Sequence, residues 1–485
     1  MRHISSPSGR IPPCSGPRPL SRRDALRRTA VGFGSLALAD LVARAGEISG
    51  VHHGGTAHPL APRAPHFAPR AKRVIFLFMH GGPSHVDTFD HKPALIRDSG
   101  KPLPFEKPRV QFAKTGDLRK SPWEFRARGQ CGAMVSDLFP RVGAMADDLC
   151  LIKSVHGTNE AHGGALLKLH TGSDSLVRPS MGSWISYGLG TENQNLPSFI
   201  TLNPTQGHGG VGNWSSAFLP AVHHGTSIGG GKGKGKGGSQ GIAYLGDGSD
   251  AARQRAQLDL LGAMNRDHLA QAGPDAALEA RIQSFELAFK MQTEAPGIFN
   301  LSGESEATRK LYGLDDPRTE KMGRQCLLAR RLSERGVRFV QVTHGYWDQH
   351  DRLAEEHGRL ASEVDLPIAG LLTDLKARGL LEDTLVWWGG EFGRTPTSQG
   401  SDGRDHHPHA FTMWLAGAGV KPGFSYGITD DYGFYLAGQK VHIHDLHATL
   451  LHLLGLDHEA LTFRHAGRDF RLTDVHGDVA HPILA

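Results

Sequence analysis

Four short apolar runs, each followed at once by histidine or glutamate, constrain the fold of this chain more than any other feature. The runs are residues 73–79, 149–155, 337–343 and 384–390. The first is apolar without interruption after Arg73, which is typical of a strand that is buried on both faces of a parallel sheet, and the other three are mainly apolar. The pattern therefore predicts a sheet with both faces covered.

Segments with helical periodicity lie between these runs. Ile368, Leu371, Leu372 and Leu375 recur at helical spacing, and a cationic turn and Gly379 follow them as a stop signal. Helices are also predicted over residues 251–271, 277–291 and 307–334. This alternation of strands and helices predicts an α/β/α sandwich around a mainly parallel sheet.

The carboxyl ends of parallel strands meet at one edge of a sheet, where open α/β proteins bind their ligands. The residues that follow the four runs can bind metals or act as acids, so we expect them to share one crevice. These residues are His80, Asp87, His162, Asp348, His350 and Glu391.

Three histidines, His406, His407 and His409, follow the last run. Side chains alternate along an extended segment, so His406 and His407 cannot both face inward. We predict that His407 and His409 point into the crevice together with Glu391. Mixed imidazole and carboxylate ligands favour hard or borderline metals such as zinc, manganese or iron, and calcium is also considered. We expect one or two divalent ions.

Other roles stay open for several of these residues. Glu391 could instead pair with Arg394 or Arg404. His442, His444 and His447 could bind the metal or only support the residues that do. Some hydroxyl groups follow turns and are candidates for a nucleophile, although such residues commonly cap helices. They are Ser84, Thr88, Thr158 and Ser180.

The N-terminal residues 1–45 are predicted to be a twin-arginine signal peptide. Arg22 and Arg23 precede a mildly apolar stretch, residues 30–42, that is too short to span a bilayer stably. A basic tail before a short helix is the alternative. We expect the twin-arginine export machinery as a partner, a location in the periplasm or cell envelope, and no transmembrane segment.

The remaining sequence is predicted to form a linker, residues 46–72, and one domain, residues 73–485, with a flexible Gly/Lys-rich insertion at 225–241. The formal net charge of +5 comes from the N-terminal residues and not from this domain. Residues 1–45 contain eight Arg, no Lys and two Asp, which leaves a net charge of about −1 for the rest. Electrostatics therefore gives no reason to expect a nucleic-acid partner.

Several long motifs resemble one family. They are HGGPSHVDTFDHKP, ARRLSERGVRFVQVTHGYWDQH, GGEFGRTP, GRDHHPHAF and HDLHATLLHLLGLDH, and they resemble the domain-of-unknown-function family 1501 from about Arg73 to the C-terminus. The resemblance implies a fold of the alkaline phosphatase and sulfatase superfamily with one or two metal ions at the strand ends. It also implies that His162 stands where sulfatases carry a Cys or Ser nucleophile, and that Phe392 replaces a histidine ligand.

These observations together predict an exported, metal-dependent hydrolase of phosphate or sulfate esters, with an anionic small molecule or a glycan ester as substrate. The expected ligands are His80, Asp87, Asp348, His350, Glu391, His407 and His409. His162 would complete the site as a ligand or act as a nucleophile, and Arg394 or Arg404 would hold the anionic substrate. The alternative is a non-catalytic envelope protein that binds a glycan or a partner in the same crevice.

Overall fold

A nine-stranded sheet forms the centre of the computed structural model, which describes residues 60–106, 114–229, 251–273 and 275–485. The strand order is β12-β4-β11-β8-β1-β7-β5-β6, and β15 pairs with β4. The strands are β1 (Arg73–His80), β4 (Leu149–His156), β5 (Phe199–Leu202), β6 (Thr226–Ile228), β7 (Phe339–Gly345), β8 (Thr384–Gly389), β11 (Phe411–Ala416), β12 (Phe424–Tyr426) and β15 (Val441–His442).

The four strands predicted from the apolar runs are β1, β4, β7 and β8, and all four run in the same direction. β1 is parallel to β7 and β8, whereas β11 is antiparallel to both β8 and β4. The carboxyl ends of the four predicted strands therefore lie at the same edge of the sheet. The expectation of a mainly parallel sheet is confirmed.

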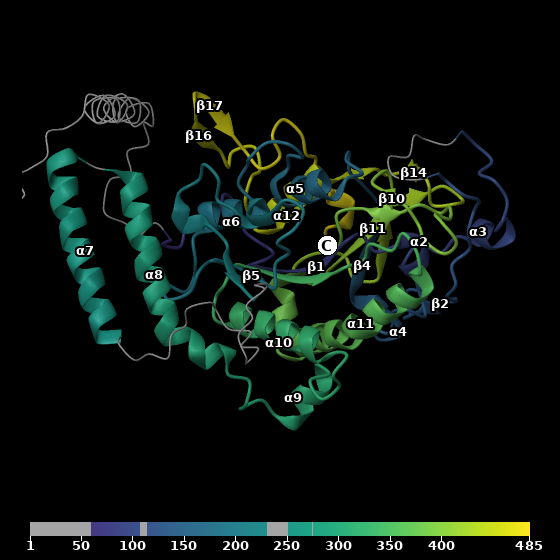
Figure 1. Cartoon of the computed structure of the whole chain (residues 1–485), viewed down its shortest axis with the longest axis horizontal. Coiled ribbons are helices and arrows are strands. Elements are labelled where there is room, and N and C mark those ends of the chain that lie inside the picture. The colour runs from purple at the N-terminus through teal and green to yellow at the C-terminus, as the bar shows by residue number, and fades with distance from the viewer. Residues whose placement is uncertain (1–59, 107–113, 230–250, 274) are drawn as a thin grey trace, which may run out of the picture. The chain divides into compact units, whose positions relative to one another are not determined.

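Helices cover both faces of this sheet (Figure 1). On one side lie α10 (Glu320–Glu334) and α11 (Leu353–Ala377), and on the other lie α5 (His162–Thr171), α6 (Met181–Leu189) and α12 (Ile443–Leu453). The remaining helices are α2 (His85–Thr88), α3 (Pro93–Arg97), α4 (Pro140–Gly143), α7 (Ala251–Ala272), α8 (Ala276–Phe299) and α9 (Glu306–Leu311). The predicted α/β/α sandwich is thus the observed architecture.

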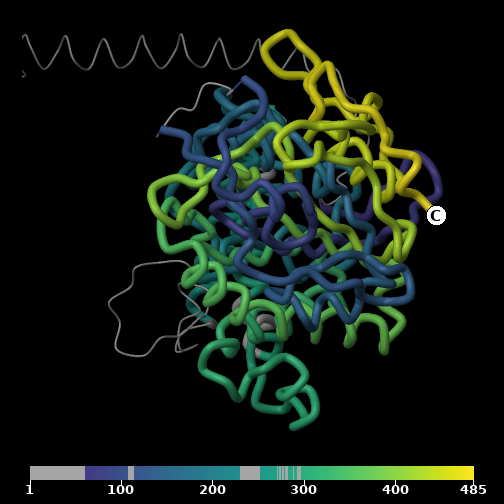
Figure 2. The backbone as a smooth tube through the Cα atoms, turned by 90° about the vertical axis from the view of Figure 1, so that its right-hand side faces the viewer, coloured from purple at the N-terminus to yellow at the C-terminus, as the bar shows by residue number. Residues whose placement is uncertain are grey.

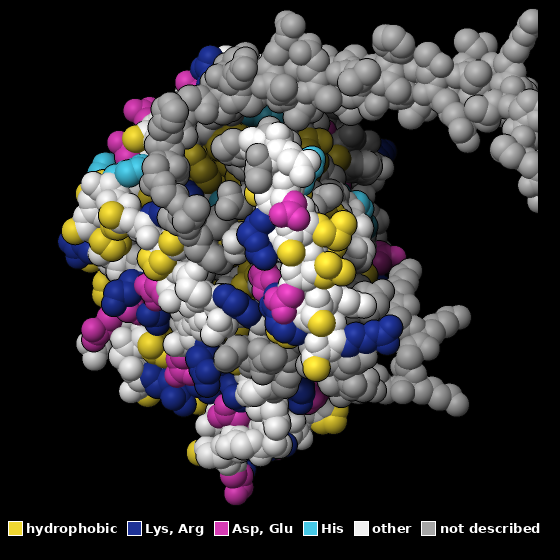
Figure 3. Space-filling model, turned by 90° about the vertical axis from the view of Figure 1, so that its left-hand side faces the viewer, with side chains coloured by type: hydrophobic (Ala, Val, Ile, Leu, Met, Phe, Trp, Pro, Cys, Tyr) yellow, Lys and Arg dark blue, Asp and Glu magenta, His cyan; other side chains and the backbone are white. Residues whose placement is uncertain are grey.

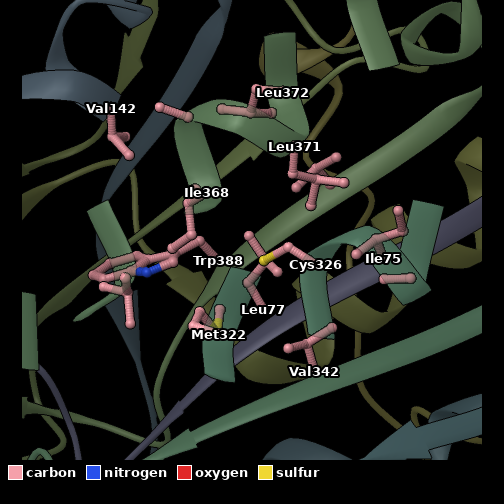
Figure 4. Packing of buried hydrophobic residues seen from close by; sticks show 14 of the residues in the cluster. Ile75, Leu77, Val142, Met322, Cys326, Val342, Ile368, Leu371, Leu372 and Trp388 are labelled. Carbon is pink, nitrogen blue, oxygen red and sulfur yellow. The ribbon is translucent and has the colours of Figure 1, made fainter. Parts of the chain in front are cut away.

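Alternation along β1 divides the hydrophobic core into two layers. Ile75 and Leu77 pack with α10 and α11 in one cluster, which Figure 4 shows around Cys326 and Trp388. Phe76 and Phe78 point to the opposite face and pack with α5, α6 and α12. Because β1 is central, both sets of side chains are fully buried. The burial of this apolar surface stabilises the position of β1 in the sheet.

Two expectations about connecting segments change in the structure. The helix predicted over residues 307–334 is divided into α9 and α10, because Gly313 takes a left-handed backbone conformation with φ of 67°. Of the predicted linker, residues 60–72 are described, and they pack on the domain (Figure 2). The backbone N–H groups of His66 and Arg70 donate to the carbonyls of Gly455 and Leu453.

Four short pairings and the ends of the chain complete the description. The two-stranded pairs are β2 (Phe125–Arg128) with β3 (Ala133–Ser136), β9 (Gly393–Arg394) with β10 (His406–His407), β13 (Ile428–Thr429) with β14 (Leu436–Gly438), and β16 (Phe463–His465) with β17 (Arg468–Phe470). The predicted signal peptide and most of the predicted Gly/Lys-rich insertion lie outside the described residues, while residues 226–228 form β6.

Among the residues described, no helix combines the length and apolar character needed to cross a bilayer. On the face of the molecule in Figure 3, Lys and Arg side chains are interleaved with Asp and Glu side chains. That face therefore presents mixed charges rather than a field of one sign.

Candidate metal centre at the strand ends

Asp348 stands at the centre of the candidate site. It follows β7, at the edge of the sheet where β1 and β8 also end. Its carboxylate meets three imidazoles through their Nε2 atoms: His350 at 2.9 Å, His406 at 3.1 Å and His162 at 3.2 Å. The Nε2 atoms of His350 and His406 lie only 3.0 Å apart. Three imidazoles thus converge on one carboxylate.

Each of these imidazoles is also held from behind at its Nδ1 atom. His162 Nδ1 donates to Glu391 Oε1 at 2.7 Å, and His406 Nδ1 donates to the carbonyl of Glu160 at 2.6 Å. His350 Nδ1 donates to the side-chain oxygen of Gln399. A hydrogen bond from one ring nitrogen to an oxygen is the usual means by which proteins aim the other ring nitrogen at a metal.

The turn after β1 brings Glu391 into place behind His162. Both Glu391 oxygens accept from the backbone N–H of Gly81, at 3.0 and 3.1 Å. Gly81 has a φ of +113°, and a Cβ there would lie 2.6 Å from the backbone nitrogen of Trp347. The close approach of this turn to the segment that carries Asp348 therefore requires glycine.

Burial and the hydrogen bonds between imidazoles and carboxylates shift the pKa values in the candidate site. Burial acts to lower the pKa of His162, but hydrogen bonds to Asp348 and Glu391 outweigh it and raise that pKa to about 9. Burial acts to raise the pKa of Glu391, but the hydrogen bond with His162 and the nearby imidazoles lower it to about 2. The pKa of Asp348 is also lowered against the effect of burial, by its hydrogen bonds to three imidazoles. Burial lowers the pKa of His406.

His406, rather than His407, faces this group, which reverses the orientation predicted for the segment. β10 pairs with β9 so that His406 lies opposite Arg394 and His407 lies opposite Gly393. Cross-strand partners share a face, and Arg394 reaches Asp348 at 2.7 Å. His407 points away and donates from Nε2 to the carbonyl of Phe434 at 2.6 Å. His409 is exposed, and its ring lies beside that of His407.

His80 lies at the side of the group together with His208, which no sequence motif singled out. His80 Nε2 and His208 Nδ1 are 3.4 Å apart, and the His208 ring stacks on that of His162 with ring centres 4.8 Å apart. Ligand atoms of His80, His162 and His208 lie within 4.8 Å of one another. Burial lowers the pKa of His80, which favours its neutral form. His208 comes from a glycine-rich loop with no recognisable motif.

The arginines that were expected to hold a substrate are fully buried and bound to the protein itself. Arg394 donates to Asp348 and to the carbonyls of Gly82 and Trp347. Arg404 forms a two-pronged pair with Asp87 at 2.7 and 3.1 Å, and neither side chain has exposed surface. Asp87 is therefore part of an internal ion pair and does not join the imidazoles.

The residues for which alternatives stayed open have structural contacts. His444 and His447 donate from Nε2 to the carbonyls of Gly172 and Leu169 at the end of α5, and His442 caps α12. Ser84 is buried and donates to Asp87. Glu391 bonds to neither arginine; its side chain contacts Gly81 and His162.

A cavity of about 440 Å³ opens in front of the imidazoles. Phe392 forms an apolar wall behind two of them: its ring centre lies 4.5 Å from that of His406 and 4.9 Å from that of His162. The cavity is lined by Ala161, His162, Gly163, His208, His350, Gln399 and His406.

The donor set fits a divalent metal ion. The buried Nε2 atom of His162 faces the Asp348 carboxylate at 3.2 Å, while Nδ1 donates to Glu391. A cation belongs between Nε2 and this carboxylate: a proton, which the raised pKa of His162 supplies in the metal-free protein, or a metal ion that replaces it. Asp348 Oδ1 lies 2.9 and 3.1 Å from the Nε2 atoms of His350 and His406, and these nitrogens are 3.0 Å apart. These distances approach the edge of a zinc tetrahedron, about 3.3 Å for bonds of about 2.0 Å. His162 Nε2 meets the other oxygen of Asp348, Oδ2, at 3.2 Å.

The comparisons with known proteins place the chain in one sequence family. The family model described as "Protein of unknown function (DUF1501)" matches residues 71–484. No curated protein matches the chain in sequence.

Solved structures with a similar arrangement of elements have low sequence identity. A protein in the alkaline phosphatase superfamily from Vibrio parahaemolyticus has a TM-score of 0.36 at 11% identity over 85% of this chain and 74% of its own. The alkaline phosphatase from the Antarctic bacterium TAB5 has a TM-score of 0.32 at 11% identity, over 81% and 99% of the two chains. The lipoteichoic acid synthase LtaP from Listeria monocytogenes has a TM-score of 0.34 at 8% identity, over 85% and 78%.

Proposed function

The chain belongs to the DUF1501 family, and we propose that it is a metal-dependent hydrolase of phosphate or sulfate esters. One observation carries this proposal: three imidazoles, each held at Nδ1 by an oxygen, aim Nε2 at the carboxylate of Asp348 beside an open cavity. Such an arrangement is typical of a catalytic metal site, which combines protein ligands with room for a substrate.

We assign the ligand set to His162, Asp348, His350 and His406. A divalent ion held there would act as a Lewis acid on an ester oxygen. Glu391 keeps His162 in the tautomer whose Nε2 faces the centre, and Gln399 does the same for His350. Arg394 fixes Asp348 and offsets part of its charge, so that the carboxylate stays ionised and in place. His80 and His208 flank this set and are candidates to bind a second ion.

Metal analysis tests the proposal. Protein purified without chelator is expected to carry at least one equivalent of zinc, manganese or calcium by mass spectrometry, and Asp348→Asn is expected to lose it. Hydrolysis of 4-nitrophenyl phosphate, bis(4-nitrophenyl) phosphate and 4-nitrophenyl sulfate is then measured before and after chelation. The proposal fails if the protein neither contains nor takes up a metal, or if no ester is hydrolysed with any of the three ions.

A binding protein without catalytic activity is the second candidate, favoured by the absence of a hydroxyl or thiol among the residues described as lining the cavity. If the protein does hydrolyse esters, the attacking group is a water molecule or His162. Full activity in His162→Ala would exclude His162 as the attacking group. Binding of an anion without turnover by the metal-loaded protein supports the binding role.

Export by the twin-arginine route is also proposed, on the strength of Arg22 and Arg23. The test is a pair of substitutions, Arg22→Lys with Arg23→Lys, in cells that carry this export pathway. We expect the variant to stay in the cytoplasmic fraction, and equal export of variant and natural sequence would contradict the proposal.

A further inference from the structure

Gln399 is the only residue among those described as lining the cavity with a carboxamide side chain. Its side-chain oxygen accepts from His350 Nδ1. Its backbone is fixed as well, because Gln399 and Gly403 exchange two hydrogen bonds of 2.9 Å each. Since the oxygen holds the imidazole, the amide nitrogen is the end that remains available to a ligand.

The charges around the cavity limit which anion it can accept. The described residues that line it include no Lys or Arg. Arg394 forms an ion pair with Asp348, and the carboxylates of Glu391 and Asp405 also attract its positive charge. When one divalent ion replaces the proton on His162, so that the histidines are neutral, these four side chains contribute two net negative charges, which the ion balances. Each further negative charge on a ligand is therefore disfavoured at short range.

We propose that this site takes a tetrahedral ester group with a single negative charge, and that Gln399 donates a hydrogen bond to one of its non-bridging oxygens. Sulfate monoesters and phosphodiesters share this chemistry, whereas phosphate monoesters carry two charges at neutral pH. A neutral amide donates a directional hydrogen bond without adding a positive charge, which suits a monoanion. A dianion is usually bound by arginine or lysine. The inference rests on the proposed function, since it concerns the same site.

Binding of three small anions tests the charge preference. The zinc-loaded protein is titrated at pH 8 with methyl sulfate, dimethyl phosphate and methyl phosphate by isothermal titration calorimetry. We expect at least one of the two monoanions to bind more tightly than methyl phosphate, and the two monoanions separate a sulfate ester from a phosphodiester as the preferred class. Tighter binding of methyl phosphate than of both monoanions would overturn the inference.

Gln399→Glu tests the role of the amide. Glutamate still offers an oxygen to His350 Nδ1, so bound zinc is expected to stay at the level of the natural protein. The variant loses the donor and adds a negative charge, so affinity for the preferred monoanion is expected to fall at least tenfold. Gln257→Glu, on the exposed side of α7, is the control for the added charge.

Two results of this substitution would count against the inference. Unchanged affinity would show that the amide does not contact the anion, and loss of zinc would show that Gln399 acts only by holding His350. Hydrolysis assays distinguish a failure of this inference from a failure of the proposed function. If the monoanion preference holds but no ester is turned over, only the hydrolase proposal fails; if esters are hydrolysed but methyl phosphate binds best, only this inference fails.

Discussion

Glu391 Oε1 accepts a 2.7 Å hydrogen bond from Nδ1 of His162, and the carboxylate has almost no exposed surface. The same carboxylate accepts from the backbone N–H of Gly81. The ends of β1 and β8 are thereby joined through one side chain, which also sets the tautomer of the imidazole. The orientation of His162 thus depends on the meeting of three segments that are far apart in the sequence.

Glu391→Gln is expected to weaken metal binding by about 10- to 100-fold. In glutamine an amide nitrogen replaces the oxygen that lies 3.1 Å from the Gly81 nitrogen, so two donors face each other. The substitution also removes the charge that makes His162 more basic. Affinity is measured by competition with a zinc-binding dye. Glu382→Gln, on an exposed turn, is the matched control and should bind zinc normally. Equal affinity in Glu391→Gln would show that Glu391 does not orient a ligand.

His406 and His407 are adjacent residues with opposite orientations, and alanine at each position separates the two roles. His406→Ala removes an imidazole that lies 3.1 Å from Asp348, so loss of bound metal is expected. His407→Ala removes the partner of the Phe434 carbonyl and is expected to reduce the free energy of unfolding by about 1–3 kcal/mol.

The measurements for this pair are metal content and chemical denaturation of the chelated protein. His407→Ala should retain metal, and His406→Ala should change the stability of the metal-free protein less than His407→Ala does. If His407→Ala were the variant without metal, the orientation predicted from sequence would be the correct one.

Gly81→Ala is expected to damage the candidate site through a steric clash. A Cβ at this position would lie 2.6 Å from the Trp347 nitrogen and 2.9 Å from the Asp348 nitrogen, so the segment that carries Asp348 must move. Gly100 is the control, because it has a similar φ of +86° with nothing within 4 Å of its Cβ position. Gly100→Ala should cost about 1 kcal/mol from backbone strain alone and leave metal binding intact. Equal effects of both substitutions on metal binding would contradict the prediction.

The sequence predicted the strand ends well and the connecting segments less well, for a physical reason. A strand buried on both faces is mainly apolar, so β1, β4, β7 and β8 could be recognised without knowledge of their neighbours. Their parallel direction then brought Asp348, His350 and Glu391 to one edge. These predictions depended only on local composition and on the topology that follows from it.

The rest of the site depends on contacts that no local pattern encodes. Whether His406 or His407 faces inward is decided by the register of β10 against β9, which follows from the placement of Arg394. The two arginines look alike in sequence, yet both are buried because Asp348 and Asp87 lie beside them. His208 reaches the site from a loop whose composition carries no signal, so only the folded chain could reveal it.

Acidification should destabilise the metal-free protein because several buried histidines stay neutral in the folded state. Burial lowers the pKa of His447 to about 3 and that of His357 to about 3, whereas a histidine in the unfolded chain has a pKa of about 6.5. Between these values the unfolded state binds more protons, so stability is fully present above about pH 6.5 and falls as the pH decreases toward 3. Each such histidine contributes a slope of up to about 1.4 kcal/mol per pH unit in this window.

His447→Gln isolates one of these contributions. Its amide N–H can replace Nε2 as the donor to the Leu169 carbonyl, but it does not titrate. Between pH 6 and pH 4.5, the free energy of unfolding from urea denaturation should therefore fall less steeply than in the natural protein, by about 1.4 kcal/mol per pH unit. His268→Gln, at an exposed position of α7, should leave the slope unchanged. An identical slope in His447→Gln and the natural protein would mean that His447 can take up its proton within the folded state, and that burial of α12 against α5 is looser than its contacts indicate.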